Sequence, residues 1–345
     1  MSTRIGKKIV LITVIALALL ATSFITVLPS VAKEGKTTVW RFNCNFAPEG
    51  WVSKGEKLFC ERVKERTGGR LIIEPYFAAS LGFKSTEGAS VLKKGLVEMA
   101  ELCGGALRGE EPMVAFGDIP FMWADQDEQL YWCLNDFKPV LNEKLHEKWN
   151  CEALAVIVYP GNVKVYSKEP VKNLEDWKGL RIRTWGGPIM DALKAIGAKP
   201  MTVDVAELYT ALQRGMVKAS ITSYTSASEA HFWEVLNYIN LYTLSYNPWW
   251  VAVNTSALNA LPEDVRKILL DEAWILQNWL IAHRDLEKTV CLKMLLNGGM
   301  KVVPVDPAFY DQIIPMVKPI WERAAKDAGP GAQKLLKELL AERER

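Results

Sequence analysis

The sequence is poor in the residues and motifs from which enzymes build active sites. Its 345 residues include only three histidines. We find no G-x-S-x-G elbow, no H-E-x-x-H pair, no Walker loop and no G-x-G-x-x-G turn after a strand. No group of residues combines a nucleophile, a base and oxyanion donors. The sequence therefore predicts a protein that recognises a ligand without catalysis, with a hydrolase or isomerase of unknown type as the alternative.

The sequence also has no excess of charge of one sign. The chain has 42 lysines and arginines against 40 acidic residues, and without residues 1–32 the basic count falls by three to 39. A near-neutral chain has no electrostatic footprint for nucleic acid or for an acidic membrane surface. Binding to nucleic acid is therefore not expected.

Paired cysteine motifs are also missing. The six cysteines form no C-x-x-C pair, and no histidine lies near one at the spacing of a zinc site. An oxidising compartment would allow one or two disulfides, but a chain of about 310 residues does not need them. We expect buried free thiols, no metal and no cofactor. The cysteines are Cys44, Cys60, Cys103, Cys133, Cys151 and Cys291.

The first 32 residues predict export. Three basic residues precede an uncharged apolar run over residues 9–28, and the small residues Ser30, Val31 and Ala32 follow. This order is typical of a secretory signal peptide. An uncleaved membrane anchor is the alternative, because about 20 apolar residues can span a bilayer. The cleavage point itself has no cysteine, which argues against a lipoprotein.

The remaining chain predicts an α/β protein with two lobes. Strand-like and helix-like segments alternate, which implies mainly parallel sheets flanked by helices. About 310 residues exceed what one hydrophobic core usually serves. A helical stretch of about 35 residues from Pro262 is longer than one lobe and should span both. No linker separates the lobes, so strands should cross between them and form a hinge.

Two arginines alternate with apolar residues in the strand "GLRIRTWGGP". Period-two alternation places Arg181 and Arg183 on one face of the strand, and the glycines at 186 and 187 end it. The pair indicates either a solvated edge or a strand end that holds an anion.

The thirteen tryptophans offer walls for a pocket. Trp51, Trp185, Trp249 and Trp250 lie at predicted strand ends or in loops, where an indole can line a pocket and donate its N–H. Core packing is the alternative for each of them.

Six segments of the sequence, taken in chain order, resemble the solute-binding subunits of TRAP transporters, the DctP-type proteins. They are "ERTGGRLIIEPYFAASLG", "DIPFMW", "KEPVKNLEDWKGLRIRTWGGP", "ALKAIGAKP", "ELYTALQRG" and "LNALPEDVRKILLDEA". The resemblance covers almost the whole mature chain. It implies a two-lobed periplasmic binding protein of type II-like fold, monomeric, which hands a small organic acid to the small and large membrane subunits. A sensor subunit that binds the same ligand is a further alternative.

The resemblance also implies the lobe ranges and the site. Lobe I is expected over residues 33–160 and about 247–280, and lobe II over 161–246 and about 281–345. In the family an arginine in the "G-L-K-I-R" strand pairs with the ligand carboxylate, and Arg183 occupies that position, with a structural ion pair as the alternative. The full set of expected ligand-binding residues is Asn43, Phe46, Cys103, Arg183, Trp185, Gly186, Thr222, Ser223, Tyr224, Trp249 and Trp250.

Two departures from the family pattern bear on the ligand. Many members carry a second arginine 20 residues before the first, where this chain has Val163 with Lys164 beside it. The family's "G-V-V-D-G-Q-E-N-P" appears as "GMVKASITSY", so hydroxyls replace amides and no carboxylate remains to hold a bridging metal ion. We therefore expect a monocarboxylate, aromatic or hydrophobic in character, with a short aliphatic 2-oxo or hydroxy acid as the second candidate.

Overall fold

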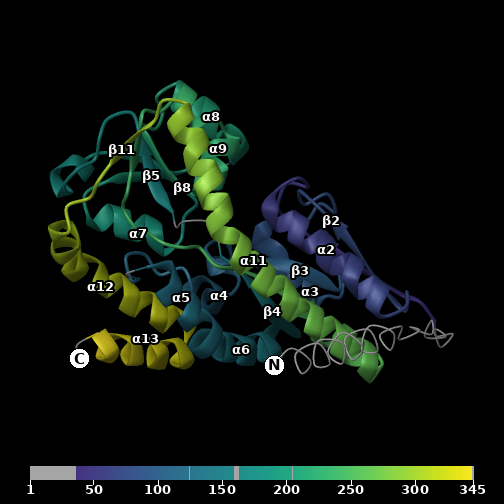
Figure 1. Cartoon of the computed structure of the whole chain (residues 1–345). Coiled ribbons are helices and arrows are strands. Elements are labelled where there is room, and N and C mark those ends of the chain that lie inside the picture. Colours follow the sequence, from purple (N-terminus) through teal and green to yellow (C-terminus); the bar gives the residue numbers. More distant parts are fainter. Residues whose placement is uncertain (1–35, 124, 159–162, 204, 344–345) are drawn as a thin grey trace, which may run out of the picture. The chain divides into compact units, whose positions relative to one another are not determined.

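Two mixed β-sheets form the centre of the structure (Figure 1). This computed structural model describes residues 36–123, 125–158, 163–203 and 205–343, and the predicted signal peptide, 1–32, lies outside the described residues. Sheet A has the order β2-β1-β3-β10-β4, and sheet B has the order β11-β9-β5-β8-β6-β7. The part of the chain around sheet A is called lobe I here, and the part around sheet B lobe II.

All strands of each sheet except one run in the same direction. In sheet A, β10 is antiparallel to both of its neighbours, and in sheet B the same holds for β5. The mainly parallel sheets predicted from the sequence are confirmed. The strands of sheet A are β1 (Thr38–Asn43), β2 (Leu71–Tyr76), β3 (Met99–Cys103), β4 (Cys151–Ile157) and β10 (Trp249–Asn254). Those of sheet B are β5 (Lys164–Ser167), β6 (Arg181–Thr184), β7 (Lys199–Thr202), β8 (Ala219–Thr222), β9 (Tyr238–Asn240) and β11 (Lys301–Val303).

Helices cover both faces of the sheets, as the alternating order predicts. Those on the chain's first half are α2 (Trp51–Arg66), α3 (Gly88–Lys93), α4 (Pro112–Phe116), α5 (Gln126–Trp132) and α6 (Lys138–Trp149). Those on the second half are α7 (Pro188–Ala195), α8 (Val205–Gln213), α9 (Tyr224–Glu229), α10 (Thr255–Ala260), α11 (Glu263–Asn297), α12 (Ala308–Ala328) and α13 (Pro330–Arg343). Among the described residues no helix has both the length and the apolar character needed to cross a membrane.

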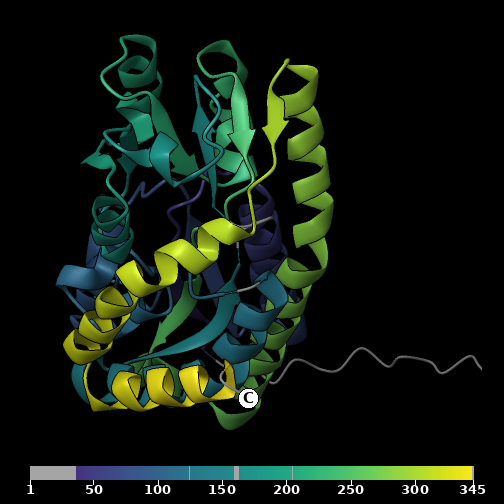
Figure 2. The same ribbon diagram turned by 90° about the vertical axis from the view of Figure 1, so that its left-hand side faces the viewer.

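The long helix α11 runs alongside both lobes (Figure 2). It has 35 residues, begins with Glu263 and Asp264, whose charges favour a helix N-terminus, and ends at Gly298. At 1.5 Å per residue it is about 52 Å long. Its first half packs on α2, where Arg62 and Arg66 bind the buried carboxylate of Glu272 at 2.6 and 2.7 Å. The predicted hinge-spanning helix is confirmed.

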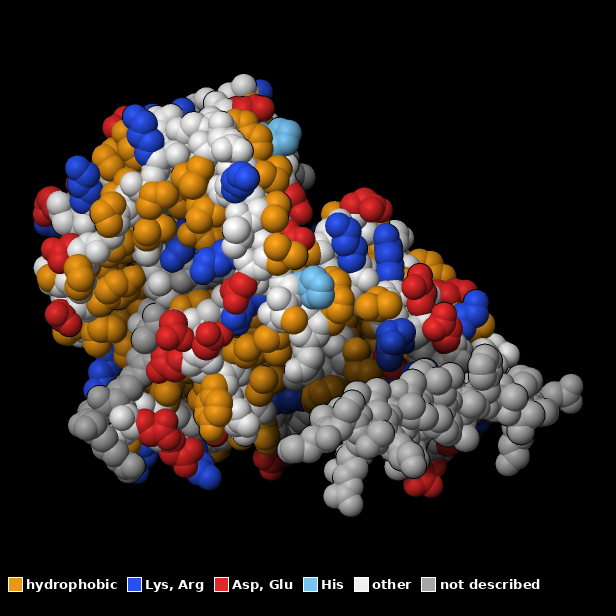
Figure 3. Space-filling view, in the orientation of Figure 1, with side chains coloured by type: hydrophobic (Ala, Val, Ile, Leu, Met, Phe, Trp, Pro, Cys, Tyr) orange, Lys and Arg blue, Asp and Glu red, His pale blue; other side chains and the backbone are white. Residues whose placement is uncertain are grey.

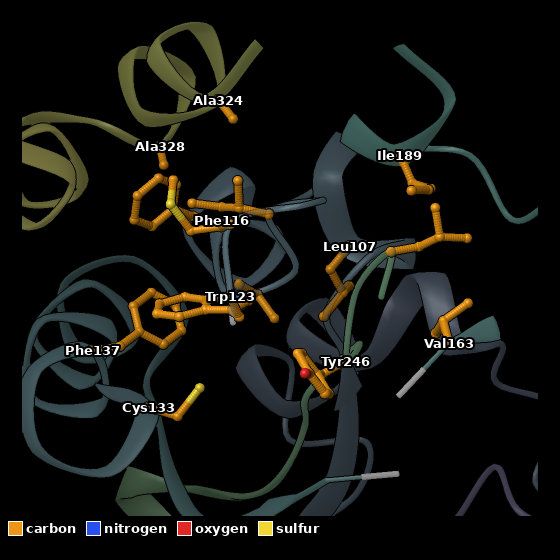
Figure 4. Close-up of a cluster of buried hydrophobic side chains, with 14 of the residues drawn as sticks. Leu107, Phe116, Trp123, Cys133, Phe137, Val163, Ile189, Tyr246, Ala324 and Ala328 are labelled. Atoms are coloured by element: carbon orange, nitrogen blue, oxygen red, sulfur yellow. The ribbon is translucent and has the colours of Figure 1, made fainter. Parts of the chain in front are cut away.

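A continuous apolar core joins the two lobes. Two smaller cores lie on the outer sheet faces, under α2 and α11 in lobe I and under α8 and α9 in lobe II. The largest core combines the inner faces of both sheets with α4–α7, α12 and α13. Figure 4 shows part of it, where Phe116, Trp123 and Phe137 lie on one side and Val163 and Ile189 on the other. The exact lobe boundaries stay a prediction.

All six cysteines are buried and unpaired, which is the arrangement predicted from their spacing. Charged side chains of both signs are interspersed on the surface seen in Figure 3. That face therefore carries no large patch of one charge.

Two carboxyl groups are buried together beneath sheet A. Glu56 on α2 and Glu101 on β3 are fully buried, and their carboxyl groups lie close together beside Cys44. Burial raises the pKa of Glu101 to about 7. It raises the pKa of Glu56 well above its ordinary value, and the charge of Glu101 adds to this effect. Because two adjacent carboxylates repel each other away from water, the pair favours a shared proton.

This pair predicts that stability falls as the pH rises through about 7. The folded pKa of Glu101 lies above the unfolded value near 4.5, so the folded protein binds more protons than the unfolded chain across this interval. Glu101→Gln should flatten the fall in the free energy of unfolding between pH 5 and pH 8. Urea unfolding at several pH values measures it, with Glu61→Gln on the exposed side of α2 as the control. An unchanged slope in Glu101→Gln would contradict the prediction.

Candidate ligand-binding site

A cavity of about 400 Å³ lies between the two lobes, where the strands of both sheets end. It opens at the carboxyl ends of β3, β6, β7 and β8 and at the amino end of the antiparallel β10. Open α/β sheets bind ligands at this edge, because the loops that follow parallel strands gather there. The lining residues are Ser85, Thr86, Cys103, Ala106, Val163, Arg183, Trp185, Thr202, Val203, Thr222, Ser223, Ser226, Asn247 and Trp249.

A larger groove of about 510 Å³ lies between α12 and α13. Three charged side chains and several alkyl groups line it, and none of the strand ends reaches it. Since it draws residues from two neighbouring C-terminal helices alone, we take the cavity between the lobes as the candidate site.

Arg183 is the one charged residue among the described residues that line the cavity. Its side chain is 5% exposed, and its Nε–H donates to the carbonyl of Val203 at 2.9 Å. This bond fixes the plane of the guanidinium at the cavity wall. Arg181, two residues earlier on the same strand, is exposed and donates to the carbonyl of Gly215. The strand therefore separates a buried arginine at the site from a solvated one.

Lys164 does not supply a second cation to the cavity. It is buried on the other side of β5 from Val163, and its Nζ lies 3.4 Å from the carbonyl of Leu241. Burial lowers its pKa to about 7, with a smaller effect from Lys288. Val163 faces the cavity in its place. The cavity therefore keeps a single fixed positive charge among its described residues.

Uncharged hydrogen-bonding groups make up much of the remaining wall. Ser223 caps α9 by accepting from the backbone N–H of Ser226 at 3.1 Å, and the two hydroxyls lie 3.2 Å apart. The Asn247 Oδ1 accepts from the backbone N–H of Gly105 at 3.4 Å. Further hydroxyls at the cavity come from Ser85, Thr86, Thr202 and Thr222. These groups can bind hydroxyl, carbonyl or amide groups of a ligand.

Two tryptophans from different lobes form apolar walls. Trp249 begins β10 in lobe I and packs on Phe46, with ring centroids 4.8 Å apart. Trp185 follows β6 in lobe II and reaches across to Gly105 in lobe I. Burial of Cys103 raises the pKa of its thiol well above its ordinary value. Cys103 therefore contributes a neutral thiol to the wall and no thiolate.

Six of the eleven predicted site residues line the cavity. They are Cys103, Arg183, Trp185, Thr222, Ser223 and Trp249. The structure thus brings residues from both lobes to one place, and their contact with a ligand remains a prediction.

The other five predicted residues lie outside the lining of this cavity, and their contact with a ligand stays a prediction. Trp250 is fully buried against Phe137, because successive residues of a strand point to opposite faces and Trp249 takes the cavity side. Tyr224 is buried in the outer core of lobe II. Phe46 stands behind Trp249 and lines a small hollow of about 50 Å³.

Gly186 and Asn43 complete this group. Gly186 has φ +101°, a conformation that favours glycine, so it shapes the turn after β6. Asn43 ends β1, and its two side-chain polar atoms are buried with no hydrogen-bond partner among the residues that the structure describes. Neither residue lines the cavity.

Sequence reasoning missed the contributions of loops. Ser85 and Thr86 lie on the short helix η1 (Ser85–Glu87), and Asn247 lies in the segment that crosses from β9 to β10. No local pattern marks them. For Asn247 one signal was available, because it directly precedes the "PWW" segment that was assigned to the pocket.

One group of described residues has the donor atoms for a metal ion. The Cys44 Sγ and carboxylate oxygens of Glu56 and Glu101 lie within 4.8 Å of one another. The group is buried beneath sheet A and does not reach the cavity. A proton shared by the two carboxyl groups would hold them together without an ion.

The close approach of Gly105 to Trp185 generates a prediction. A Cβ at position 105 would lie 2.6 Å from the Trp185 Nε1, whereas nothing lies within 4 Å of a Cβ at Gly109. Gly105→Ala should therefore displace the indole and lower the free energy of unfolding by about 1–3 kcal/mol. Urea unfolding compares it with the control Gly109→Ala, which we expect to be nearly neutral. Equal stability of the two variants would show that the indole is not held at Gly105.

Comparisons with known proteins agree with this geometry. The family model "Bacterial extracellular solute-binding protein, family 7" (DctP) matches residues 42–327. A solute-binding protein of Sulfitobacter sp. (strain NAS-14.1) is 25% identical over 299 residues, which cover 85% of this chain and 88% of that protein.

Solved structures share the fold. The Bordetella pertussis solute receptor DctP7, which binds pyroglutamic acid, superposes with TM-score 0.78 and 24% identity over 88% of this chain and 100% of that chain. A TRAP periplasmic solute-binding protein from Desulfovibrio salexigens with bound orotic acid gives TM-score 0.78 and 24% identity over 88% and 98%. Because the family model spans most of the described residues, the chain belongs to the DctP family of bacterial extracellular solute-binding proteins.

Proposed function

We propose that this solute-binding protein captures a small organic acid with one carboxylate and delivers it to the membrane subunits of a TRAP transporter. The observation that carries the proposal is the charge of the cavity. Its described lining contains one cation, Arg183, and no acidic residue. A guanidinium binds a carboxylate through two parallel hydrogen bonds and stays charged at every physiological pH. A second ligand carboxylate would be buried without a counter-charge, which is costly.

The relatives support this class of ligand. Pyroglutamic acid and orotic acid, named for DctP7 and for the Desulfovibrio salexigens protein, each have one carboxyl group on a ring with amide groups. The walls formed by Trp185 and Trp249 suit the flat face of such a ring. The hydroxyls of Thr222 and Ser223 suit its carbonyl and N–H groups. A short aliphatic 2-oxo or hydroxy acid is the second candidate, because the same hydroxyls would bind its oxygen.

The proposal includes export to the periplasm with removal of residues 1–32. The pattern of basic, apolar and small residues and the extracellular family support it. The protein isolated from its native envelope should begin near Lys33. Mass spectrometry of the intact protein measures this, and recovery of the chain with Met1 and the apolar segment would favour a membrane anchor instead.

The ligand class can be tested with pairs of compounds that differ by the carboxylate alone. Orotate should raise the melting temperature and uracil should not, and the same should hold for pyroglutamate against 2-pyrrolidone. Succinate and malate should stabilise less than the better of the two monocarboxylates. A thermal-shift panel decides this. A larger shift with succinate or malate than with every monocarboxylate would reject the single-carboxylate site.

The role of Arg183 predicts a large loss on truncation. Arg183→Ala would leave the ligand anion buried without a partner, which costs about 3–5 kcal/mol by analogy with broken buried pairs. This corresponds to a loss of affinity of roughly a hundred- to several-thousand-fold. Arg183→Lys should recover part of it, because an ammonium cannot form the two parallel bonds.

Arg181→Ala is the matched control, since the same side chain is removed from an exposed position on the same strand. It should change affinity little, because solvent screens exposed charges. Calorimetry with the carboxylate that gives the largest thermal shift measures all three variants. Similar losses in both alanine variants would mean that the anion does not bind at Arg183.

A further inference from the structure

Asp118 is a buried carboxyl at the junction of the two lobes. It follows α4 in lobe I and is 1% exposed. Its Oδ1 accepts hydrogen bonds from the Ser245 hydroxyl and from the backbone N–H of Asn247, the latter at 3.0 Å. Both donors belong to the segment that crosses from β9 to β10. Asp118 therefore anchors a crossing segment to lobe I.

The second oxygen of Asp118 faces lobe II. The indole N–H of Trp185 and the Asp118 carboxyl both lie against Gly105, and the attraction of the N–H for the carboxylate opposes the rise in the pKa of Asp118 that burial causes. Oδ2 of Asp118 and Nε1 of Trp185 are both buried, and neither has a hydrogen-bond partner within bonding distance among the described residues. Gly105 lies against both atoms, and a Cβ there would be 3.1 Å from that oxygen. The space between the lobes is thus shaped for this one contact.

Asp118 touches two residues of the ligand cavity without lining it. Trp185 carries the cavity wall on lobe II, two residues after Arg183, and Asn247 carries the wall on the crossing segment. Asn247 has φ +39°, a strained conformation for a residue with a side chain. Its hydrogen bond to Asp118 holds this conformation. One carboxyl thereby connects two walls of the cavity to lobe I.

An ion pair at the surface also joins these parts of the lobes. Arg108 on η2 (Ala106–Gly109) lies 3.4 Å from Asp191 on α7, and the two side chains are 32% and 28% exposed. Solvent screens such a pair. The buried contact between Asp118 and Trp185 has no competing water, so it responds more strongly to opening of the cleft.

We propose that Asp118 and Trp185 form a latch between the lobes that favours the closed cleft, and that Asp118 is a positioning residue for ligand binding. The inference rests on the proposed function, because a latch beside the cavity matters only if the cleft closes on a ligand. The latch is tested below on the ligand-free protein, whereas the proposed function is tested by the thermal-shift panel. Either test can therefore fail while the other succeeds.

The substitution Asp118→Asn breaks the latch selectively. The amide oxygen must take the place of Oδ1, since two donors point at that position. The amide –NH₂ then faces the indole N–H of Trp185, donor against donor. Trp185→Phe removes the donor from the other side of the latch. In the double variant the –NH₂ no longer meets an N–H, so the second substitution should add little to the first.

The experiment measures the radius of gyration of the ligand-free full-length mature protein and the ¹H–¹⁵N resonances of its indole groups. Asp118→Asn and Trp185→Phe should each increase the radius of gyration, and the double variant should match Trp185→Phe. The indole resonance that disappears in Trp185→Phe should shift in Asp118→Asn. Trp132→Phe, a buried ring stacked on Phe137 away from the cleft, is the control and should leave the radius unchanged.

Two single variants are used so that the test still decides if one of them misfolds. Each disrupts the latch from a different lobe. An unchanged radius of gyration in both single variants would overturn the proposal. So would a Trp185 indole resonance that keeps its position in Asp118→Asn. Additive increases in the double variant would also overturn it, because independent effects mean that the two side chains do not act on each other.

Discussion

A carboxylate taken out of water needs a fixed cation and a full set of hydrogen bonds, because no amount of apolar contact compensates for an unpaired buried charge. In the proposed function that requirement falls on Arg183, whose guanidinium is held at the cavity wall by the carbonyl of Val203. The position of the arginine depends on β6 ending at the cleft, and that depends on the parallel order of sheet B. The proposed ligand class follows from this one charge.

Under the proposed function the two lobes open and close over this charge. A single apolar core continues from sheet A to sheet B, and α11 runs alongside both (Figure 2). The inserted strands β5 and β10 are the antiparallel members of their sheets, and the chain crosses between lobes just before each of them. In the proposed closure a few crossing segments would bend while both sheets stay intact. The proposed contact between Asp118 and Trp185 lies where that bending brings the lobes together.

The sequence was sufficient for features that repeat along the chain. The alternation of strands and helices predicted two mainly parallel sheets, and the apolar spacing from Pro262 predicted a helix of about 35 residues. Alternation in "RIRT" placed Arg181 and Arg183 on one face, but exposure differs between them because only the second reaches the strand end.

The features that sequence could not supply depend on contacts between distant segments. The strand that begins with two adjacent tryptophans must turn one to the cavity and one to the core, and the choice of Trp249 depends on pairing with β3 and β4. No local pattern marks Asp118, and its proposed role emerges only when residues 245 and 247 are folded against it. Loop residues such as Ser85 and Thr86 carry no periodicity, so nothing local marks them as cavity residues.

The central claim is that one ligand carboxylate binds to Arg183 between two tryptophan walls. A crystal structure of the protein with the solute that co-purifies from its native host tests this most directly. The account predicts one carboxylate paired through two hydrogen bonds with the Arg183 guanidinium, and the rest of the ligand between Trp185 and Trp249. A ligand without a carboxylate, or a carboxylate bound away from Arg183, would contradict it.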